Sequence, residues 1–228
     1  MKLSQNTLSL LQSFATINAN LLVKPGNKLI TRNASGGAQA RAVVEETFPV
    51  QFAIYDLNQL LGLLSISGDP DVTFGEKSLI IKSPNGGELE YYYADPSLVT
   101  SPPDNELQIE STFTFTIPAT DISIVQKTSN LVSATTLTFV CDGGDVTMKI
   151  NDPKNTTSNT YRKVVGTCDK SFAMKMSADT FRSIVPDSYE VQVGIAIGRG
   201  GARVPVFTFN STSRKLTYLI AADPTSKI

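Results

Sequence analysis

The chain has 228 residues, 41% of them hydrophobic, and a formal net charge of −1 at pH 7. This length suffices for one large or two small domains, and the near-neutral charge argues against a protein that coats nucleic acid nonspecifically. The sequence has no histidine, which removes the commonest general base near neutral pH and the commonest zinc ligand.

The charges are distributed unevenly along the sequence. Through Gln108 the sequence has seven Lys or Arg and eleven Asp or Glu, whereas from Ile109 onward it has thirteen Lys or Arg and ten Asp or Glu. The second half is therefore the more basic one.

The cysteines and the apolar runs indicate the compartment. Cys141 and Cys168 lie far apart in the sequence, without the spacing of a metal site, so we expect reduced thiols buried in strands. No apolar run has the length of a signal peptide or a membrane span. We therefore expect a soluble, intracellular protein with no membrane partner.

The first half is predicted to begin with a helix. Ser4 can cap it, and its apolar residues from Leu8 to Ile17 recur at spacings of three and four. Pro25-Gly26 marks a turn, and Asn85-Gly86 is typical of a hairpin. The strands expected in this half are residues 28–32, 39–45, 71–74, 78–83 and 88–93.

Residues 52–66 form the stretch around which this half is organised. It starts as a strand, and Asp56 can then cap a helix. The helix has a narrow stripe of leucines from Leu57 to Leu64. Its other face is polar but uncharged, with Asn58, Gln59 and Ser65. Such a face usually lies against solvent, and it can also face a large polyanion.

Residues 95–104 contain three prolines, which cannot continue a sheet, and they are predicted to form an extended connector. The expected domains are therefore residues 1–108, including the connector at about 95–108, and residues 109–228.

The second half is predicted to repeat this element order. Pro118 fits the first turn of a third helix, and Ser177 can cap a short fourth helix that ends at Pro186-Asp187. Their apolar faces are expected to be Ile122, Val125 and either Ser129 or Leu131 in the third helix, and Phe181, Ile184 and Val185 in the fourth. The strands expected here are residues 112–117, 136–141, 146–150, 161–167, 172–176, 190–197, 204–210 and 215–221.

The two halves also share short phrases. Phe52-Ala53 and Phe172-Ala173 each precede a helix, and an Ala-Asp-Pro phrase closes each half, at Ala94 and at Ala222. The same short motifs at the same point in the same order of elements indicate an internal repeat. The sequence therefore predicts an α+β protein with two similar domains.

Two loops resemble ligand sites but have simpler explanations. Asp142 and Asp145 flank Gly-Gly, and two carboxylates without further ligands usually make a turn, so no metal is expected. Residues 198–203 are rich in Gly and Arg but do not precede a helix, which favours a hairpin turn over a phosphate-binding loop.

Several segments resemble the sliding clamp of T-even-type bacteriophages, and the resemblance covers the first hundred residues. The residues that carry it are Met1 to Ser4, Thr7, Leu10-Leu11, residues 14–18 (FATIN), residues 54–58 (IYDLN), Leu61-Gly62, Leu64-Ser65 and residues 94–97 (ADPS). The second half is similar in element order and length but has few identities.

The resemblance implies a non-enzymatic replication protein without a cofactor. The family forms head-to-tail homotrimeric rings, in which each subunit has two copies of the DNA-clamp fold with two short helices on antiparallel sheets. The helices line a hole for double-stranded DNA, bound without sequence preference. A DNA polymerase is tethered to the ring, an ATP-driven clamp loader is a partner, and the location is the host cell cytoplasm.

The family lines its hole with Lys and Arg, and this chain departs from that pattern. The first helix has Gln5 and Gln12 where basic residues are expected, and the second helix has no basic residue. The residues that could face DNA are Lys2, Lys127, Lys175, Arg182, Arg199 and Arg203. For Lys127 and Arg182 the alternative is an ordinary solvated charge.

The resemblance also implies a hydrophobic pocket beside the connector that receives a short apolar peptide from a partner. The candidate lining residues are Leu98, Val99, Pro102 and Pro103 in the connector, and Tyr218, Ile220 and Pro224 near the C-terminus. The alternative is that Leu98 and Val99 only pin the connector to a sheet.

Two other classes remain. A β-rich viral structural protein, from a tail or capsid, would share the low charge and the many short strands, but would not need a helix pair in each half. A hydrolase is disfavoured, because no Ser–His or Cys–His pair exists and no catalytic residue is expected.

Overall fold

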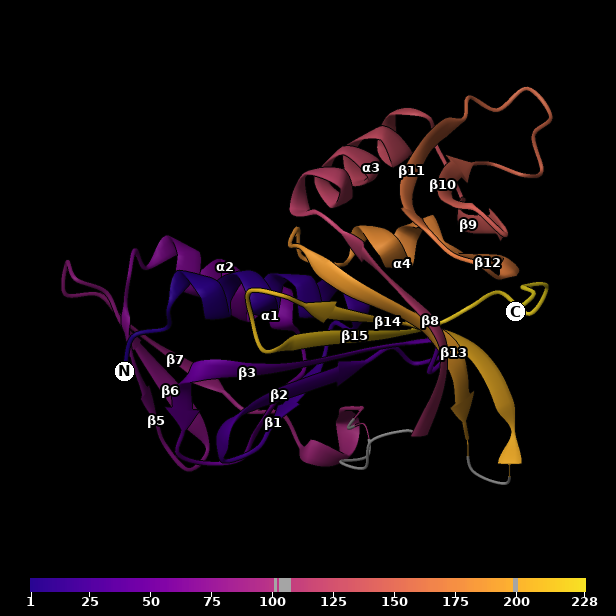
Figure 1. Cartoon of the computed structure of the whole chain (residues 1–228). Coiled ribbons are helices and arrows are strands. Elements are labelled where there is room, and N and C mark those ends of the chain that lie inside the picture. The colour runs from indigo at the N-terminus through magenta and orange to yellow at the C-terminus, as the bar shows by residue number, and fades with distance from the viewer. Residues whose placement is uncertain (101, 103–107, 199–200) are drawn as a thin grey trace. The chain divides into compact units, whose positions relative to one another are not determined.

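The computed structural model describes residues 1–100, 102, 108–198 and 201–228 (Figure 1). The chain divides into two compact units, Met1–Pro103 (unit 1) and Asp104–Ile228 (unit 2). The domain boundary predicted from the sequence, after residue 108, lies slightly later in the chain than this division. The first strand of unit 2 begins at Gln108.

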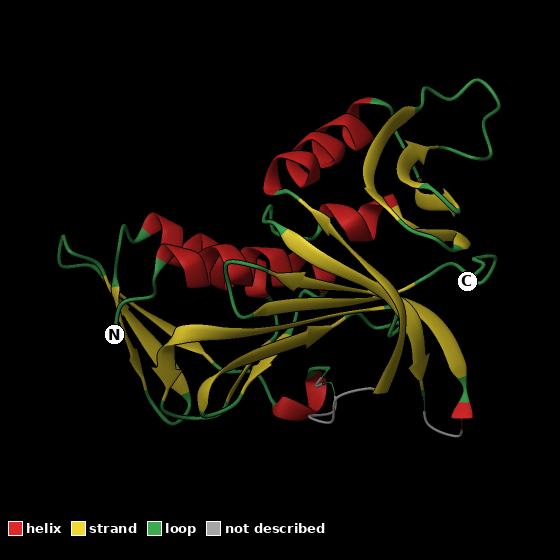
Figure 2. Cartoon of the chain, in the orientation of Figure 1, coloured by secondary structure: helices red, strands yellow, loops and turns green. Residues whose placement is uncertain are grey.

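The described part of unit 1 contains the α-helices α1 and α2 and a set of antiparallel strands (Figure 2). Strand β1 pairs with β4, β2 pairs with β3, and β5, β6 and β7 form a three-stranded sheet. The elements are α1 (Gln5–Ile17), β1 (Leu21–Val23), β2 (Gly26–Arg32), β3 (Ala38–Phe48), β4 (Phe52–Ile54), α2 (Leu57–Ile66), β5 (Asp71–Phe74), β6 (Ser78–Lys82), β7 (Glu88–Tyr92) and the 3-10 helix η1 (Pro96–Leu98).

The core of unit 1 follows from the alternation in its strands and the apolar stripes of its helices. Buried and less buried residues alternate along β3, so one face is turned inward. Helices α1 and α2 lie side by side (Figure 1) and bury Phe14 and Leu57 completely. An aromatic cluster of Phe48, Phe52, Phe74 and Tyr93 extends this core.

Unit 2 repeats the pattern with longer strands. One sheet has the order β11-β10-β9-β12, and in the other β15, β14, β13 and β8 are successive neighbours. The elements are β8 (Gln108–Ile117), α3 (Ala119–Leu131), β9 (Thr136–Asp142), β10 (Asp145–Asn151), β11 (Tyr161–Thr167), β12 (Ser171–Ser177), α4 (Ala178–Arg182), β13 (Tyr189–Ile197), β14 (Arg203–Ser211) and β15 (Leu216–Ala221).

Phenylalanines from the strands of unit 2 form its core. Phe139 contacts both Phe115 and Phe207, with ring centroids 5.3 and 5.5 Å away. The pairing of β13 with β8 shifts register at Gly194. A Cβ atom there would lie 2.4 Å from the carbonyl oxygen of Glu110, so this bulge requires glycine.

The α+β class and the helix pair in each half are confirmed, with local differences. The three-residue β1 was not predicted. Helix α4 ends at Arg182, before the predicted stop, and Ser177 precedes it without a side-chain capping bond. Of the two alternatives predicted for the apolar face of α3, Ser129 is buried, whereas Leu131 is 85% exposed.

Both cysteines are free thiols. Cys141 is buried in strand β9, as predicted, whereas Cys168 is only partly buried and follows the end of β11, so the prediction of a strand position was wrong for this residue. None of the helices in the described part of the chain combines the length and apolar character needed to span a bilayer.

Candidate nucleic-acid interface

The exposed sides of α1 and α2 form an uncharged, amide-rich surface, which we call the neutral face. Neither helix sequence contains a charged residue. The exposed polar side chains that define the face are Gln5, Gln12, Thr16, Asn58, Gln59 and Ser65. A groove of about 270 Å³ runs between the helices, lined in part by Leu8, Gln12, Leu61 and Ser65. This face can form hydrogen bonds, but it cannot neutralise a phosphate.

Hydrogen bonds at both helix starts fix this face. Ser4 Oγ accepts a bond from the Thr7 N–H of α1 at 3.2 Å, and the Asp56 carboxylate accepts one from the Gln59 N–H of α2 at 3.1 Å. The buried Glu46 carboxylate of β3 adds a second cap to α1. It accepts bonds from the Ser4 N–H and the Thr7 hydroxyl, both at 2.5 Å.

Burial raises the pKa of Glu46, but these hydrogen bonds outweigh it and leave the pKa below its ordinary value. A carboxylate that stays ionised beside the first turn also matches the positive end of the helix dipole.

Lys2, the residue of unit 1 that was predicted to face DNA, is paired with an acidic residue. Lys2 Nζ donates to Asp69 Oδ2 at 2.6 Å, and both side chains are exposed. This hydrogen bond, with the nearby negative charge, raises the pKa of Lys2. Because Asp69 offsets the charge of Lys2, the structure gives this residue less net attraction for phosphate than the sequence indicated.

Lys127 is an exposed residue on α3 of unit 2. Among the described residues, it has no hydrogen bond or ion pair. Its helix is anchored instead by the buried Asp121, which forms an ion pair with Lys163 of β11. No acidic side chain in the described part of the chain offsets the charge of Lys127.

Arg182 at the end of α4 is different, because its guanidinium is occupied within unit 2. It donates to Ser129 Oγ of α3 at 3.1 Å and to the Ala134 carbonyl oxygen at 3.4 Å, and it pairs with Asp179. These bonds join α3 to α4, so the structure favours a packing role for this arginine over the DNA-facing one.

Two further basic candidates, Lys175 and Arg203, lie on strands. Lys175 on β12 donates to Thr225 Oγ1 at 3.1 Å, and Arg203 on β14 pairs with Glu110 at 2.6 Å. Arg199 lies outside the described residues. Of the five described candidates, Lys127 is the one without a partner in the described part of the chain.

The candidate pocket residues divide into exposed and buried ones. Leu98 is 63% exposed, and Pro224 is exposed, whereas Val99 is only 9% exposed. Pro102 is also buried, and Pro103 lies outside the described residues. Val99 and Pro102 therefore belong to the packing of the connector rather than to an open surface.

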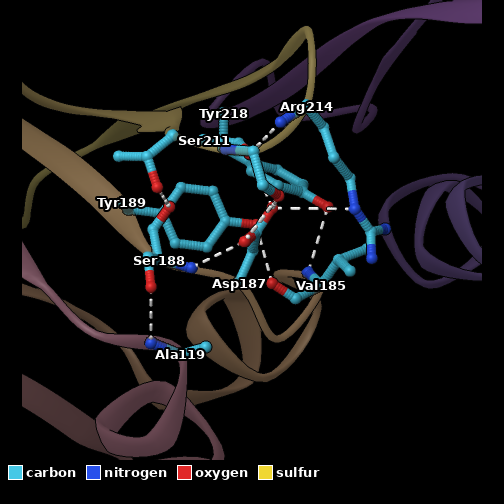
Figure 3. A network of polar contacts seen from close by, with 10 residues as sticks. Ala119, Val185, Asp187, Ser188, Tyr189, Ser211, Arg214 and Tyr218 are labelled. Carbon is cyan, nitrogen blue, oxygen red and sulfur yellow. Dashed lines mark hydrogen bonds and ion pairs between the residues drawn. The ribbon is translucent and has the colours of Figure 1, made fainter.

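Tyr218 and Ile220 are likewise not on an open surface, because they are only 1% and 2% exposed. The Tyr218 hydroxyl accepts a bond from the Val185 N–H at 3.1 Å, and the Tyr189 hydroxyl donates to the Val185 carbonyl oxygen at 2.7 Å (Figure 3). As placed, these two side chains are in the interior and offer no surface to a peptide.

Figure 3 also shows a polar network beside these tyrosines, which was not predicted from the sequence. The buried Asp187 carboxylate accepts bonds from Ser211 Oγ at 2.6 Å, Ser213 Oγ at 2.7 Å and the Ser188 N–H at 2.7 Å. Arg214 Nε lies 3.6 Å from it. Burial raises the pKa of Asp187, but these partners outweigh it and leave the pKa below its ordinary value. The network ties the start of β13 to the β14–β15 turn.

Comparison with known proteins identifies related sequences. No family model matches the chain. It is 26% identical to the sliding clamp of Vibrio phage KVP40 over 199 residues, which cover 85% of this chain and 90% of that one. It is 37% identical to the sliding clamp of Enterobacteria phage T4 over 103 residues, 45% of each chain.

Solved structures of low identity share the fold. The proliferating cellular nuclear antigen (PCNA) of Entamoeba histolytica has a TM-score of 0.64 at 11% identity, covering 95% of this chain and 94% of that one. The beta sliding clamp of C. crescentus has a TM-score of 0.65 at 11% identity, covering 99% of this chain and 65% of that one.

The fold of this chain is therefore that of the sliding clamps. Within that class its sequence homologues are sliding clamps of bacteriophages, which confirms the resemblance in the first hundred residues and extends it into unit 2. These findings support a DNA sliding clamp as the function, and they do not favour a tail or capsid protein.

Proposed function

We propose that three copies of this chain form a head-to-tail ring around duplex DNA and tether a replicative DNA polymerase. An ATP-driven loader places the ring on DNA in the host cytoplasm, and the ring has no catalytic role. The observation that carries this proposal is the relationship to a phage sliding clamp over 85% of the chain, together with the clamp fold of the chain. Two similar units per chain also suit a ring of near six-fold packing.

The helix surfaces indicate how such a ring would contact DNA. The neutral face of unit 1 offers amides and hydroxyls, and Lys127 of unit 2 offers an unpaired charge. Hydrogen bonds to phosphate carry no sequence information, and few cations give weak electrostatic attraction. This arrangement suits a ring that is held by topological linkage and slides without a strong grip.

A partner peptide is the second element of the proposal. PCNA of A. fulgidus, whose fold this chain shares with a TM-score of 0.64 at 12% identity, has been solved with the C-terminal region of FEN-1 bound. For this chain, the exposed Leu98 at the end of η1 is the apolar residue of the connector that a polymerase peptide could contact.

Primer extension on a primed circular template tests the proposed function. The reaction contains the cognate polymerase and loader, and an excess of competitor DNA limits the polymerase to one binding event. We expect much longer products when this protein and ATP are present. A linear template with free ends is the control, because a ring slides off it and the gain should disappear. Equal product lengths with and without the protein on the circle would contradict the proposal.

A further inference from the structure

The two cysteines of the chain are in contact at one end of the four-stranded sheet of unit 2. The Cys141 sulfur of β9 lies 3.3 Å from the carbonyl oxygen of Cys168 and 3.4 Å from that of Gly144, and either oxygen can accept its hydrogen. The Cys168 N–H donates to the same Gly144 oxygen at 2.8 Å. The two cysteines are 27 positions apart in the sequence, so the fold brings them together.

The strand order explains why they meet. In the order β11-β10-β9-β12, the strands β11 and β12 are the two edges of the sheet (Figure 1). Residues 168–170 join them, and this segment passes the turn of Gly143 and Gly144 between β9 and β10. Cys168 is the first residue of the segment, and Cys141 lies at the end of β9 just before that turn.

The two thiols differ in access. Cys141 is only 3% exposed, whereas Cys168 is partly exposed. The Cys168 sulfur accepts a hydrogen bond from the Lys170 N–H at 3.4 Å and lies 3.9 Å from the Asp169 carboxylate, and both partners belong to its own short segment. A reagent from solvent therefore reaches Cys168 before Cys141.

The distance between the residues suits a disulfide. Since a carbonyl oxygen lies at most about 2.8 Å from its own Cα, the Cys141 sulfur is at most about 6 Å from the Cys168 Cα. A rotation of the Cys168 side chain and a small shift of the turn can then close an S–S bond of about 2.05 Å. The turn has room for this shift, because a Cβ atom at Gly143 or Gly144 would meet no described atom within 4 Å.

We infer that Cys141 and Cys168 form a dithiol site, which small-molecule disulfides such as oxidised glutathione convert into an intramolecular disulfide. Cys168, as the thiolate, attacks one sulfur of the reagent, and the other half of the reagent leaves as a thiol. Cys141 then loses its proton and attacks the Cys168 sulfur, which releases the second half as a thiol. The protein gives up two electrons and two protons, and these reduce the reagent to two thiols.

The new bond ties the β9–β10 turn to the segment that leads into β12. Disulfides in a cytoplasm are mostly transient and respond to the redox state, so we expect this one to be reversible. The site goes beyond the proposed function and does not depend on it, because it uses residues outside the helices and the connector.

Reaction of the folded protein with dithiobis(nitrobenzoate), an aromatic disulfide that releases a coloured thiol, tests the inference. Absorbance counts the thiol that is released, and intact mass spectrometry identifies what stays on the protein. Cys141→Ser and Cys168→Ser each leave one thiol, and thermal unfolding checks that both variants are folded. Peptide mapping without reductant identifies the linked cysteines.

The wild type should release two coloured thiols per chain and keep no adduct, so its mass should fall by two hydrogen atoms. The Cys141→Ser protein should release one and keep the adduct on Cys168, because the second thiol is gone. The Cys168→Ser protein should react at least about tenfold more slowly, since its remaining thiol is buried. Oxidised glutathione should give the same mass loss in the wild type, and dithiothreitol should reverse it.

A wild type that keeps one or two adducts would overturn the inference, because its thiols then react independently. A stable glutathione adduct on Cys168 would overturn it in the same way. A disulfide between two chains, detected by electrophoresis without reductant, would show that Cys168 pairs outside its own unit. The wild-type measurements decide all of these outcomes, so the test holds even where a serine variant does not fold.

Discussion

The Glu46 carboxylate on β3 accepts a hydrogen bond from the Thr7 hydroxyl in the first turn of α1, at 2.5 Å, and both residues are buried. A strand residue thus fixes the start of a helix that is far away in the sequence. Since α1 presents half of the neutral face, this pair links the stability of unit 1 to the geometry of the candidate DNA surface.

We predict that Glu46→Ala lowers the free energy of unfolding at pH 7 by about 1–3 kcal/mol, because two bonds to a buried charged acceptor are lost. Glu46→Gln keeps the shape without the charge, so it should lose less. Urea unfolding measures both variants. An equal loss in the two variants would show that charge, rather than hydrogen bonding, accounts for the effect.

The pH dependence of stability follows from the lowered pKa of Glu46. A carboxyl whose folded pKa lies below its unfolded value stabilises the fold above the unfolded value of about 4.3, and this contribution is lost as the pH falls through the folded pKa. The difference in stability between wild type and Glu46→Gln should therefore shrink as the pH is lowered from 6 to about 3. A constant difference over this range would contradict the pKa direction.

Asp187 and Arg214 should be strongly coupled in their contributions to the free energy of unfolding. Asp187→Ala leaves the partly buried Arg214 without its acidic partner, and we expect a loss of about 3 kcal/mol in the free energy of unfolding. In the double variant with Arg214→Ala, the total should be less than the sum of the single losses. A double-mutant cycle by urea unfolding measures this coupling, and strict additivity would contradict it.

Local chemistry accounts for what the sequence predicted well. The helices α1 and α2 begin where Ser4 and Asp56 accept backbone bonds within three residues, which a sequence pattern reveals. Strand β1 was missed because three residues show too little alternation.

The side-chain predictions were weaker because they depend on distant partners. Nothing near Arg182 in the sequence indicates a bond to the Ala134 carbonyl oxygen, and nothing near Tyr218 indicates a bond from the Val185 N–H. Adjacent residues of the connector also turn in opposite directions, so Leu98 is exposed and Val99 is buried. Composition cannot distinguish these two.

Substitutions of Lys127 and of Arg182 should change different properties, the first DNA association and the second stability. Lys127→Glu should weaken association with DNA and flatten its salt dependence, because an unpaired exposed cation is lost. Arg182→Ala should instead lower the free energy of unfolding by about 1–2 kcal/mol, since bonds between α3 and α4 are lost. Loading onto nicked circular DNA at several salt concentrations measures the first effect, with Lys154→Glu as the loop control. A Lys127→Glu protein with an unchanged salt slope would remove this residue from the DNA surface.

The exposed and buried residues of the connector give the last prediction, which concerns the proposed peptide contact. Leu98→Asp places a charge on a side chain that is already in water, so the fold should be kept, while an apolar peptide loses its contact. Val99→Asp buries a charge and should destabilise unit 1, so it cannot serve as a test of docking.

Fluorescence anisotropy with a labelled C-terminal peptide of the cognate polymerase measures binding to the Leu98→Asp protein. Ile66→Asp, at the exposed end of α2, is the matched control. We expect the dissociation constant to rise about tenfold or more for Leu98→Asp and to stay unchanged for the control. If the folded Leu98→Asp protein binds the peptide with wild-type affinity, the peptide does not contact the connector at this residue.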